Sequence, residues 1–404
     1  MTLADVGTTG RVLVISASVG AGHHGAANEL GRRLRRAGLV VDRRDFLDAL
    51  PRWIRFVLRS GYGPTVTHLP RFYNWLFWTL ERPSWIRTIC LLITRLGQRE
   101  VARWCSGASA VVSTYPLASQ CLAQLVQRRR LAIPTTTFLT DPAAHSLWVS
   151  PYIDRHLTVL PATARLGEAA YATPMTAVGP LVSERFGRKL SAQRRAALRA
   201  ELGATSGRRL ALVVAGSLAL GRVRETVEAL VETELVVPVV LCGRNQRLLH
   251  QLRSRPGVVA LGWRNDVHEL MNLCDVLVHN AGGMSFSESL VAGLPAVTFA
   301  CITGHGRANG DVLAHYGIAP TAETVDELRE ALRRQLDPDA CERLRARLPH
   351  TGADAASVVL GDIRSARQAM ALVSASSSTS RTRSSPTPQE SWAEPGHAAL
   401  EGRP

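Results

Sequence analysis

Two histidines lie inside a glycine-rich loop near the start of the chain. The stretch VLVISASVGAGHHGAANEL spaces Gly20, Gly22 and Gly25 as G-x-G-x-x-G, and His23 and His24 fill the two central positions. This spacing is typical of dinucleotide-binding turns. An imidazole that titrates near neutral pH can instead remove the proton of a reacting hydroxyl group. The loop therefore has two interpretations, a cofactor-binding turn or a turn that presents His23 to a substrate.

Asp42 supports the dinucleotide interpretation. It is expected to end the second strand, roughly 20 residues after the glycines, where a ribose-binding acid would lie. However, that fingerprint places its first glycine at the end of the strand, and here residues 16–19 intervene. Nothing in the second half of the chain resembles a dehydrogenase site. An NAD(P)-binding oxidoreductase therefore stays an alternative.

A second glycine turn lies in DVLVHNAGGMSFSESLVAGLPAVTFACITGHGRANGDVL, residues 275–313. We expect a strand that runs into residues 280–283 and a helix that starts with Ser285 as its N-cap. The free N–H groups and the dipole of a helix start bind anions such as a diphosphate. Glu288, in the first turns of that helix, could hold a ribose diol with both carboxylate oxygens.

The elements that would position these residues alternate between strand and helix. Short apolar runs predict strands at residues 11–16, 38–42, 108–114 and 133–140, and again at 208–216, 236–243, 257–263, 275–280 and 295–300. A helix is expected over residues 26–38. The alternation predicts an α/β fold with two Rossmann-like domains, residues 10–180 and 181–371. The following residues, 372–404, are rich in Ser, Thr and Pro and predict a disordered tail without a packed core.

Residues 51–96 break this alternation. Four of the eight tryptophans, Trp53, Trp75, Trp78 and Trp85, lie here among arginines. Apolar side chains with cationic and indole edges suit a membrane interface or a lipid-acceptor groove. The alternative is a pair of ordinary helices whose aromatic side chains pack on the core.

The charge balance indicates anionic partners. Lys and Arg number 48 against 33 Asp and Glu, a net charge of +15, which suits phosphates, nucleic acid or an anionic membrane surface. A compositional bias towards arginine is the alternative. No nucleic-acid-binding module matches, so we expect no nucleic acid partner.

The sequence also shows no sign of a secretion signal or of a membrane-spanning segment. We find no signal peptide, no uncharged apolar run near the roughly 18 residues of a spanning helix, and no C-x-x-C among seven scattered cysteines. The odd cysteine count argues against a complete set of intrachain disulfides. We expect a cytoplasmic protein that lies on the inner face of the cell membrane without crossing it.

Several motifs occur together and in a characteristic order. They are SASVGAGHHGAANEL, LTDPAAHSLWVSPYIDRHLTV, VVAGSLALG, LCGRNQRL and GWRNDVHELMNLCDVLVHNAGGMSFSESLVAGLP. From about residue 12 to about residue 319 the chain resembles the monogalactosyldiacylglycerol synthase and processive diacylglycerol glucosyltransferase family. More distantly, it is similar to the N-acetylglucosaminyltransferase of peptidoglycan lipid synthesis. The resemblance implies an inverting enzyme of the GT-B fold, in which two Rossmann-like domains face a central cleft.

The resemblance also implies substrates and site residues. A hexose or N-acetylhexosamine would move from a UDP-sugar to a lipid that is similar to diacylglycerol. His23 matches the loop histidine that acts as base or positions the acceptor, and His24 lies on the other side of the turn. The implied catalytic residues are His23 and Asp141, and the implied acceptor-binding residues are Gly22, His145, Trp53 and Trp75. The implied donor-binding residues are Gly216, Ser217, Arg244, Gly282, Gly283, Met284, Ser285, Glu288 and Asn309.

The chain departs from the family pattern at two places. His305 and Gly306 stand where the family has a Gln–Glu pair that helps to hold the sugar, although Asn309 keeps its place. Pro142 follows Asp141, where an aromatic residue is usual. A non-catalytic protein that binds UDP-sugar or lipid therefore stays a second alternative.

We expect neither a metal nor a further cofactor. No D-x-D carboxylate pair lies at the end of an expected strand. A helix N-terminus together with arginine can stabilise a departing nucleoside diphosphate instead. The expected mechanism is a single displacement in which the deprotonated acceptor attacks the face opposite the leaving group.

Overall fold

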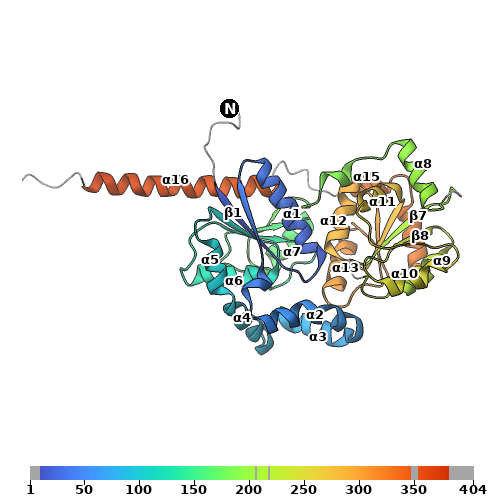
Figure 1. Cartoon of the computed structure of the whole chain (residues 1–404), viewed down its shortest axis with the longest axis horizontal. Coiled ribbons are helices and arrows are strands. Elements are labelled where there is room, and N and C mark those ends of the chain that lie inside the picture. The colour runs from blue at the N-terminus through green and yellow to red at the C-terminus, as the bar shows by residue number, and fades with distance from the viewer. Residues whose placement is uncertain (1–9, 205–206, 217–218, 347–353, 382–404) are drawn as a thin grey trace, which may run out of the picture. The chain divides into compact units, whose positions relative to one another are not determined.

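The computed structural model describes residues 10–204, 207–216, 219–346 and 354–381. The chain divides into a large compact unit that ends at Ile363 and a C-terminal unit that begins at Arg364. The large unit contains two parallel six-stranded sheets covered by helices (Figure 1). The predicted α/β class with two Rossmann-like sheets is confirmed, whereas the predicted boundary at residue 180 stays a prediction.

The first sheet has the order β2-β1-β3-β4-β5-β6. We call the part from β1 to β6 the N-half. Its strands are β1 (Arg11–Ser16), β2 (Val40–Asp45), β3 (Ala110–Ser113), β4 (Thr135–Leu139), β5 (Arg155–Thr158) and β6 (Thr176–Ala177). Its α-helices are α1 (Ala21–Arg36), α2 (Arg52–His68), α3 (Pro70–Glu81), α4 (Trp85–Leu96), α5 (Gln98–Cys105), α6 (Pro116–Gln127) and α7 (Pro161–Tyr171), with the 3₁₀ helix η1 (Phe46–Ala49).

The second sheet has the order β12-β11-β10-β7-β8-β9. We call the part from α8 to α15 the C-half. Its strands are β7 (Leu210–Val214), β8 (Val237–Leu241), β9 (Val259–Leu261), β10 (Val276–His279), β11 (Ala296–Phe299) and β12 (Thr321–Ala322). Its helices are α8 (Ala192–Glu201), α9 (Val223–Thr233), α10 (Gln246–Arg253), α11 (Val267–Leu273), α12 (Gly283–Ala292), α13 (His305–His315), α14 (Val325–Gln335) and α15 (Ala340–Ala346).

Both strand orders place the candidate loops at a point where the order reverses. Central strands such as β4 and β7 are buried along their whole length, as parallel sheets with both faces covered require. The order reverses between β1 and β3 in the first sheet and between β7 and β10 in the second. Ligands of open α/β sheets bind outside the carboxyl ends of the strands at such points. The glycine loop follows β1, and the turn at residues 280–283 follows β10.

Several boundaries differ from the sequence-based expectation. Helix α1 begins at Ala21 rather than at residue 26, so the glycine loop already belongs to it. Strand β2 extends to Asp45, so Asp42 lies inside the strand, where it forms ion pairs with Arg11 and Arg44. Helix α16 (Ala355–Arg381) continues past the predicted start of the tail at residue 372, and residues 382–404 lie outside the described part.

Residues 51–96 form three helices, α2, α3 and α4, rather than a pair (Figure 1). Many of their large apolar side chains are exposed, whereas Ile54, Leu58 and Leu80 pack on the core. Trp53 and Trp85 are 68% and 72% exposed. The other exposed apolar residues of this surface are Phe56, Val57, Leu69, Phe72, Trp75, Trp78, Ile89, Leu92 and Leu96.

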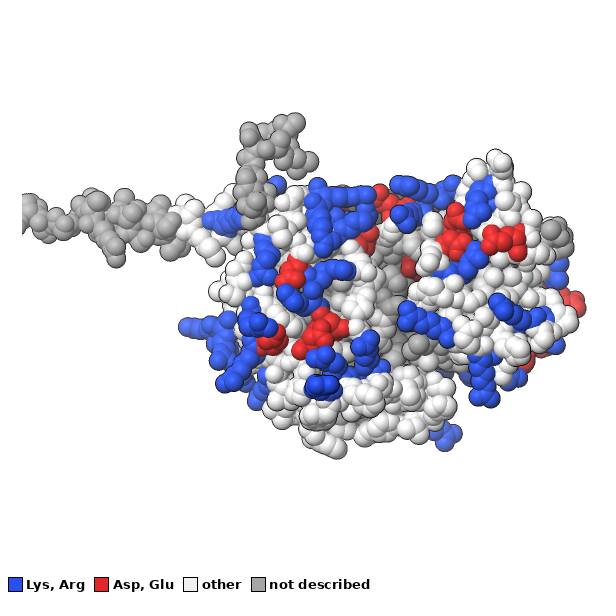
Figure 2. Space-filling view, in the orientation of Figure 1, with Lys and Arg blue, Asp and Glu red and all other residues white. Residues whose placement is uncertain are grey.

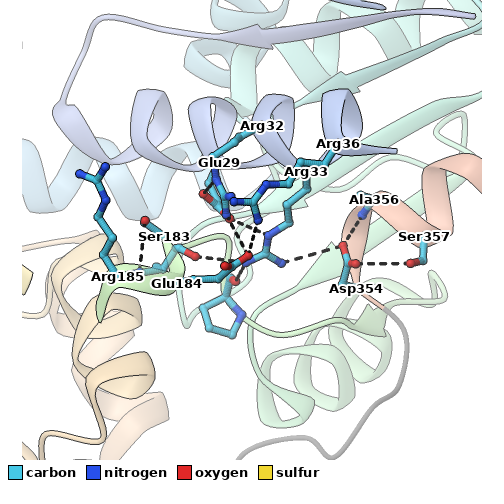
Figure 3. Close-up of polar contacts among 12 residues, drawn as sticks. Glu29, Arg32, Arg33, Arg36, Ser183, Glu184, Arg185, Asp354, Ala356 and Ser357 are labelled. Atoms are coloured by element: carbon cyan, nitrogen blue, oxygen red, sulfur yellow. Dashed lines mark hydrogen bonds and ion pairs between the residues drawn. The ribbon is translucent and has the colours of Figure 1, made fainter. Parts of the chain in front are cut away.

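The linker between the two sheets is fastened to α1 by a cluster of ion pairs (Figure 3). Glu29 is 5% exposed and accepts hydrogen bonds from Arg32 and Arg33. Arg33 also donates to the carbonyl oxygens of Pro180 and Val182. Since α1 carries His23 in its first turn, this cluster ties the position of the glycine loop to the linker.

Candidate active site

A cavity of about 550 Å³ lies between the N-half and the C-half. This volume lies in the usual range of roughly 300–1,000 Å³ for small-molecule sites. Most of the site residues expected from the sequence line it: Gly22, His23, Asp141, His145, Gly216, Gly282, Gly283, Met284, Ser285, Glu288 and Asn309. Ser217 lies outside the described residues. Arg244, Trp53 and Trp75 are not among the residues that line the cavity.

His23 points into the cavity from the first turn of α1. Its Nδ1 atom lies 3.3 Å from Thr140 Oγ1, and its ring packs edge-on against Tyr115 with 5.3 Å between ring centroids. Burial lowers the pKa of His23, and the nearby carboxylate of Asp141 partly opposes that shift. The imidazole is therefore neutral at pH 7 and can accept a proton, and Asp141 favours the charged imidazolium that results.

His24 points away from the cavity, as expected. Its Nδ1 and Nε2 atoms lie 2.7 Å and 2.9 Å from the hydroxyl oxygens of Ser16 and Ser18. Ser18 also hydrogen-bonds to Asp45 through both its hydroxyl group and its backbone N–H. These contacts fix the loop before α1, while His23 occupies the cavity side of the same turn.

Two of the three loop glycines make room for a residue of the C-half. Gly22 and Gly25 lie in α1, and the contact of α1 with α12 brings Met284 against them. A Cβ atom added at Gly22 would lie 3.3 Å from Met284 Cβ, and one at Gly25 would lie 3.1 Å from Met284 Cε. The glycines thus allow the two halves to approach each other beside His23.

Asn309 joins the two halves on the other side of the cavity. Its side chain is fully buried. Its Oδ1 atom accepts a hydrogen bond of 2.9 Å from the N–H of Ala143, and its Nδ2 atom donates to the carbonyl oxygen of Ala281 at 3.0 Å and to Asp141 at 3.4 Å. These amide contacts go to protein atoms of both halves. Asn309 therefore holds the Asp141 loop against the turn after β10.

Helix α12 presents its N-terminus to the cavity. It begins at Gly283 with Gly282 as N-cap, two residues before the expected cap at Ser285, which lies instead in the first turn. Because this first turn contains no acidic residue, its free N–H groups and dipole are available to an anion. Glu288 lies one turn further along, and burial raises its pKa to about 8.

Arg244 lies over a tryptophan that the sequence reasoning did not select. Its guanidinium carbon is 4.8 Å from the ring centroid of Trp263. Trp263 lines the cavity, and it is 51% exposed. Arg244 therefore contacts the cavity wall through Trp263, on whose ring it stacks. Non-local stacking of this kind leaves no sequence motif.

His145 is held by the end of α3. Its Nε2 atom lies 3.1 Å from Glu81 Oε2 and 3.2 Å from the carbonyl oxygen of Phe77. Glu81 also accepts hydrogen bonds from the N–H of Ser146 and the hydroxyl group of Tyr171. Burial lowers the pKa of His145. This cluster fixes α3 on the N-half and places His145 at the cavity wall.

Helix α3 supplies cavity residues that the sequence reasoning missed. Tyr73, Leu76, Phe77 and Leu80 line the cavity, whereas Trp75 is 50% exposed on the other face of the helix. Their spacing of three and four residues marks one face of a helix, but the opposite face is apolar as well, so the spacing alone does not identify the cavity face. Other missed cavity residues are Tyr62, Tyr115, Thr140, Trp148 and Trp263.

Within the described residues, none of the helices combines the length and apolar character needed to cross a bilayer. The exposed apolar surface described above lies on α2, α3 and α4. The part formed by α2 and α3 lies at the bottom of the space-filling view as a largely uncharged area (Figure 2).

Comparisons with known proteins agree with this arrangement. Residues 23–166 match the model of the monogalactosyldiacylglycerol (MGDG) synthase family. The processive diacylglycerol β-glucosyltransferase of Bacillus subtilis is 21% identical over 370 residues, which cover 88% of this chain and 95% of that protein. The chloroplastic monogalactosyldiacylglycerol synthase of Spinacia oleracea is 24% identical over 384 residues, which cover 87% of this chain and 72% of that protein.

A solved structure extends the likeness to the whole fold. UGT89C1 of Arabidopsis thaliana, crystallised with UDP, superimposes with a TM-score of 0.56 at 15% identity and covers 90% of this chain and all of that one. Two facing Rossmann-like halves are the GT-B arrangement. These findings favour a glycosyltransferase over an NAD(P)-binding oxidoreductase. Over most of its length the chain is similar to glycosyltransferases named monogalactosyldiacylglycerol synthase and processive diacylglycerol glucosyltransferase.

Proposed function

We propose that the protein transfers a hexose or an N-acetylhexosamine from a UDP-sugar to the hydroxyl group of a diacylglycerol-like lipid, with inversion at the anomeric carbon. One observation carries this proposal. The same cavity contains a neutral histidine, His23, from the N-half and the N-terminus of α12, whose first turn carries no acidic residue, from the C-half. A base and an anion site that face each other are the two parts that a single displacement needs.

His23 would act on the acceptor. If the Nδ1 proton is directed at Thr140 Oγ1, Nε2 is the nitrogen that would take up the hydroxyl proton of the lipid acceptor. As the proton transfers, the oxygen attacks the anomeric carbon, and the nearby charge of Asp141 stabilises the imidazolium. General-base catalysis of this type contributes roughly 10²- to 10⁴-fold to a rate.

The start of α12 would act on the leaving group. UDP departs with a developing negative charge on its diphosphate, which the N–H groups of residues 283–285 can stabilise. Glu288 would hold the ribose hydroxyls, and the stacked pair of Trp263 and Arg244 would lie against the uracil ring. We propose that no metal ion is required, because the helix start already supplies the stabilising charge.

The exposed apolar surface on α2, α3 and α4 would bring the enzyme to its lipid. Residues 51–96 contain seven arginines and one acidic residue, Glu81. Apolar side chains would enter the interface, while the arginines would contact anionic headgroups. We therefore propose a peripheral enzyme on the inner face of the cell membrane, with α3 lying between the bilayer and the cavity.

The test uses purified full-length protein, a panel of radiolabelled UDP-sugars and mixed-lipid vesicles, with and without EDTA. We expect label to appear in the lipid fraction, unaffected by EDTA, and to fall by roughly 10²- to 10⁴-fold in His23→Ala. His24→Ala is the matched control, because the neighbouring imidazole points away from the cavity. Equal losses in both variants would contradict the role of His23.

The same experiment separates a binding protein from an enzyme. UDP binding without transfer from any donor would support the non-catalytic alternative. Transfer that EDTA abolishes would refute the metal-independent mechanism but keep the glycosyltransferase. Label in the water-soluble fraction alone would refute the lipid acceptor.

A further inference from the structure

His305 of the C-half is held between two tyrosines of the N-half. Its Nδ1 atom lies 3.0 Å from the hydroxyl oxygen of Tyr73, and its Nε2 atom lies 3.5 Å from that of Tyr62. The imidazole also packs edge-on against Tyr73, with 5.9 Å between ring centroids. Tyr62 comes from α2 and Tyr73 from α3, so a single side chain of α13 contacts both helices.

The two residues before His305 also form hydrogen bonds with α3. The hydroxyl group of Thr303 donates to the carbonyl oxygen of Pro70 at 3.1 Å, and the N–H of Gly304 donates to Asn74 Oδ1 at 3.2 Å. Gly304 has a φ of 72°, and an added Cβ would lie 3.0 Å from Phe77 Cβ. The segment 303–305 therefore fits closely against the start of α3.

The hydrogen-bonding capacity of His305 is used by these contacts. A neutral imidazole offers one N–H donor and one acceptor nitrogen, and each nitrogen has a phenolic partner. Burial lowers the pKa of His305 and raises those of Tyr62 and Tyr73, so all three groups are neutral at pH 7. The cluster is thus a directional contact between the halves rather than an ion pair.

Helix α3 connects this cluster to the exposed apolar surface. Tyr73 and Phe77 face the cavity, whereas Phe72, Trp75 and Trp78 are between 43% and 50% exposed. Because α3 is a single helix, binding of its exposed face to a bilayer also positions the opposite face, which carries Tyr73. Because segment 303–305 follows β11 and begins α13, its position sets one wall of the cavity.

We propose that His305, Tyr62 and Tyr73 form a latch that couples the seating of α2 and α3 on a lipid bilayer to donor binding in the cavity. His305 is in this sense a positioning residue, which acts through the two tyrosines. Binding to the bilayer fixes the positions of α2 and α3. The latch then holds segment 303–305 against these helices, so that the cavity wall is in place when the donor binds. This inference rests on the proposed UDP-sugar site and adds a control of that site by the membrane.

The coupling is measurable as a ratio of two affinities. Linkage requires that vesicles tighten UDP binding by the same factor by which UDP tightens vesicle binding. We expect UDP titrations by calorimetry to give a dissociation constant at least about fivefold lower with vesicles of the anionic lipid phosphatidylglycerol, which contain no diacylglycerol acceptor, than without them. Vesicle sedimentation with and without UDP should return the same factor.

Tyr73→Phe tests the latch, because it removes only the hydroxyl group that contacts His305. We expect the ratio of the UDP dissociation constants without and with vesicles to fall towards one, while the melting temperature stays close to that of the wild type. Tyr152→Phe is the matched control, because that hydroxyl group accepts a hydrogen bond from Gln127 away from the cavity. His305→Gln keeps one donor and one acceptor and should retain more of the ratio than His305→Ala.

The outcomes distinguish the latch from the proposed function. If wild-type UDP binding does not respond to vesicles, or if Tyr73→Phe keeps the full ratio, the latch is wrong and the donor site stands. If UDP does not bind the wild-type protein in either condition, both the donor site and the latch are overturned.

Discussion

Gly283 lies at a close approach of the two halves, and replacing it with alanine should separate them. An added Cβ would lie 2.4 Å from the carbonyl oxygen of Thr140 and 2.9 Å from Asp141 Oδ1. Ordinary Cβ contacts begin near 3.4 Å, so the Thr140 backbone would have to move by 3.4 − 2.4 = 1.0 Å. Both partners belong to the N-half, and one of them is backbone that a rotamer change cannot relieve.

A displacement of this size should cost catalysis more than stability. Misplacing reacting groups by about 1 Å costs roughly 100-fold in rate, which equals about 2.7 kcal/mol in activation free energy. Alanine is otherwise favoured over glycine in a helix by about 1 kcal/mol. We therefore expect Gly283→Ala to keep its melting temperature within a few degrees and to lose roughly 100-fold in kcat/KM for sugar transfer.

The matched control is Gly361→Ala in α16. It makes the same substitution at an exposed helical position with nothing within 4 Å of the added Cβ. Initial rates of label transfer and thermal unfolding would be measured for both variants. A Gly283→Ala enzyme that transfers sugar within about threefold of the wild-type rate would refute the close approach of residues 140–141 to α12 as a requirement for catalysis.

Three further results are expected. Because burial lowers the pKa of His23, the base stays neutral below the ordinary histidine value of 6.5; the acid limb of kcat/KM should lie below pH 6.5, and a limb above that value would contradict the assignment. Burial raises the pKa of Glu288 to about 8, so between about pH 4.5 and 8 the folded protein keeps a proton that the unfolded chain releases, and stability falls as pH rises through this range. Glu288→Gln should raise the melting temperature more at pH 8 than at pH 5, and should weaken UDP binding in calorimetry. Trp53→Ser together with Trp85→Ser should reduce vesicle sedimentation while UDP affinity without vesicles is unchanged, and a parallel loss of UDP affinity would indicate misfolding instead of lost membrane contact.

The sequence predicts the central strands well, because parallel strands covered on both faces appear as continuous apolar runs, but it misses β5, β6 and β12. It also locates both glycine turns, since each directly follows such a run. The starts of the helices are less predictable. Helix α1 begins in the polar residues GHHG, and α12 begins at Gly283 rather than after Ser285. In both cases contacts between α1 and α12, far apart in sequence, stabilise a first turn that lacks a side-chain cap.

The aromatic segment shows a different limit. The residue types in α3 indicate an interface, but both faces of the helix are apolar, so its composition does not say which face points inward. Trp75 is expected to bind the acceptor because it is a tryptophan, but it lies on the exposed face, whereas Tyr73 and Phe77 line the cavity. Arg244 and Trp263 stack although they are far apart in sequence, and only the fold reveals such a pair.

The spacing of the loop glycines now has a structural reason that does not involve a dinucleotide. Residues three positions apart lie on the same face of a helix, and Gly22 and Gly25 lie together on the face of α1 that meets Met284. His23, between them, points to the cavity, because a different face of the same turn is turned towards it. A side chain at either glycine would push α12 away from α1 and thereby separate the base from the helix start that stabilises the leaving group. Helix packing across the cleft is therefore sufficient to require G-x-x-G, and the resemblance to a nucleotide-binding fingerprint follows from helical periodicity.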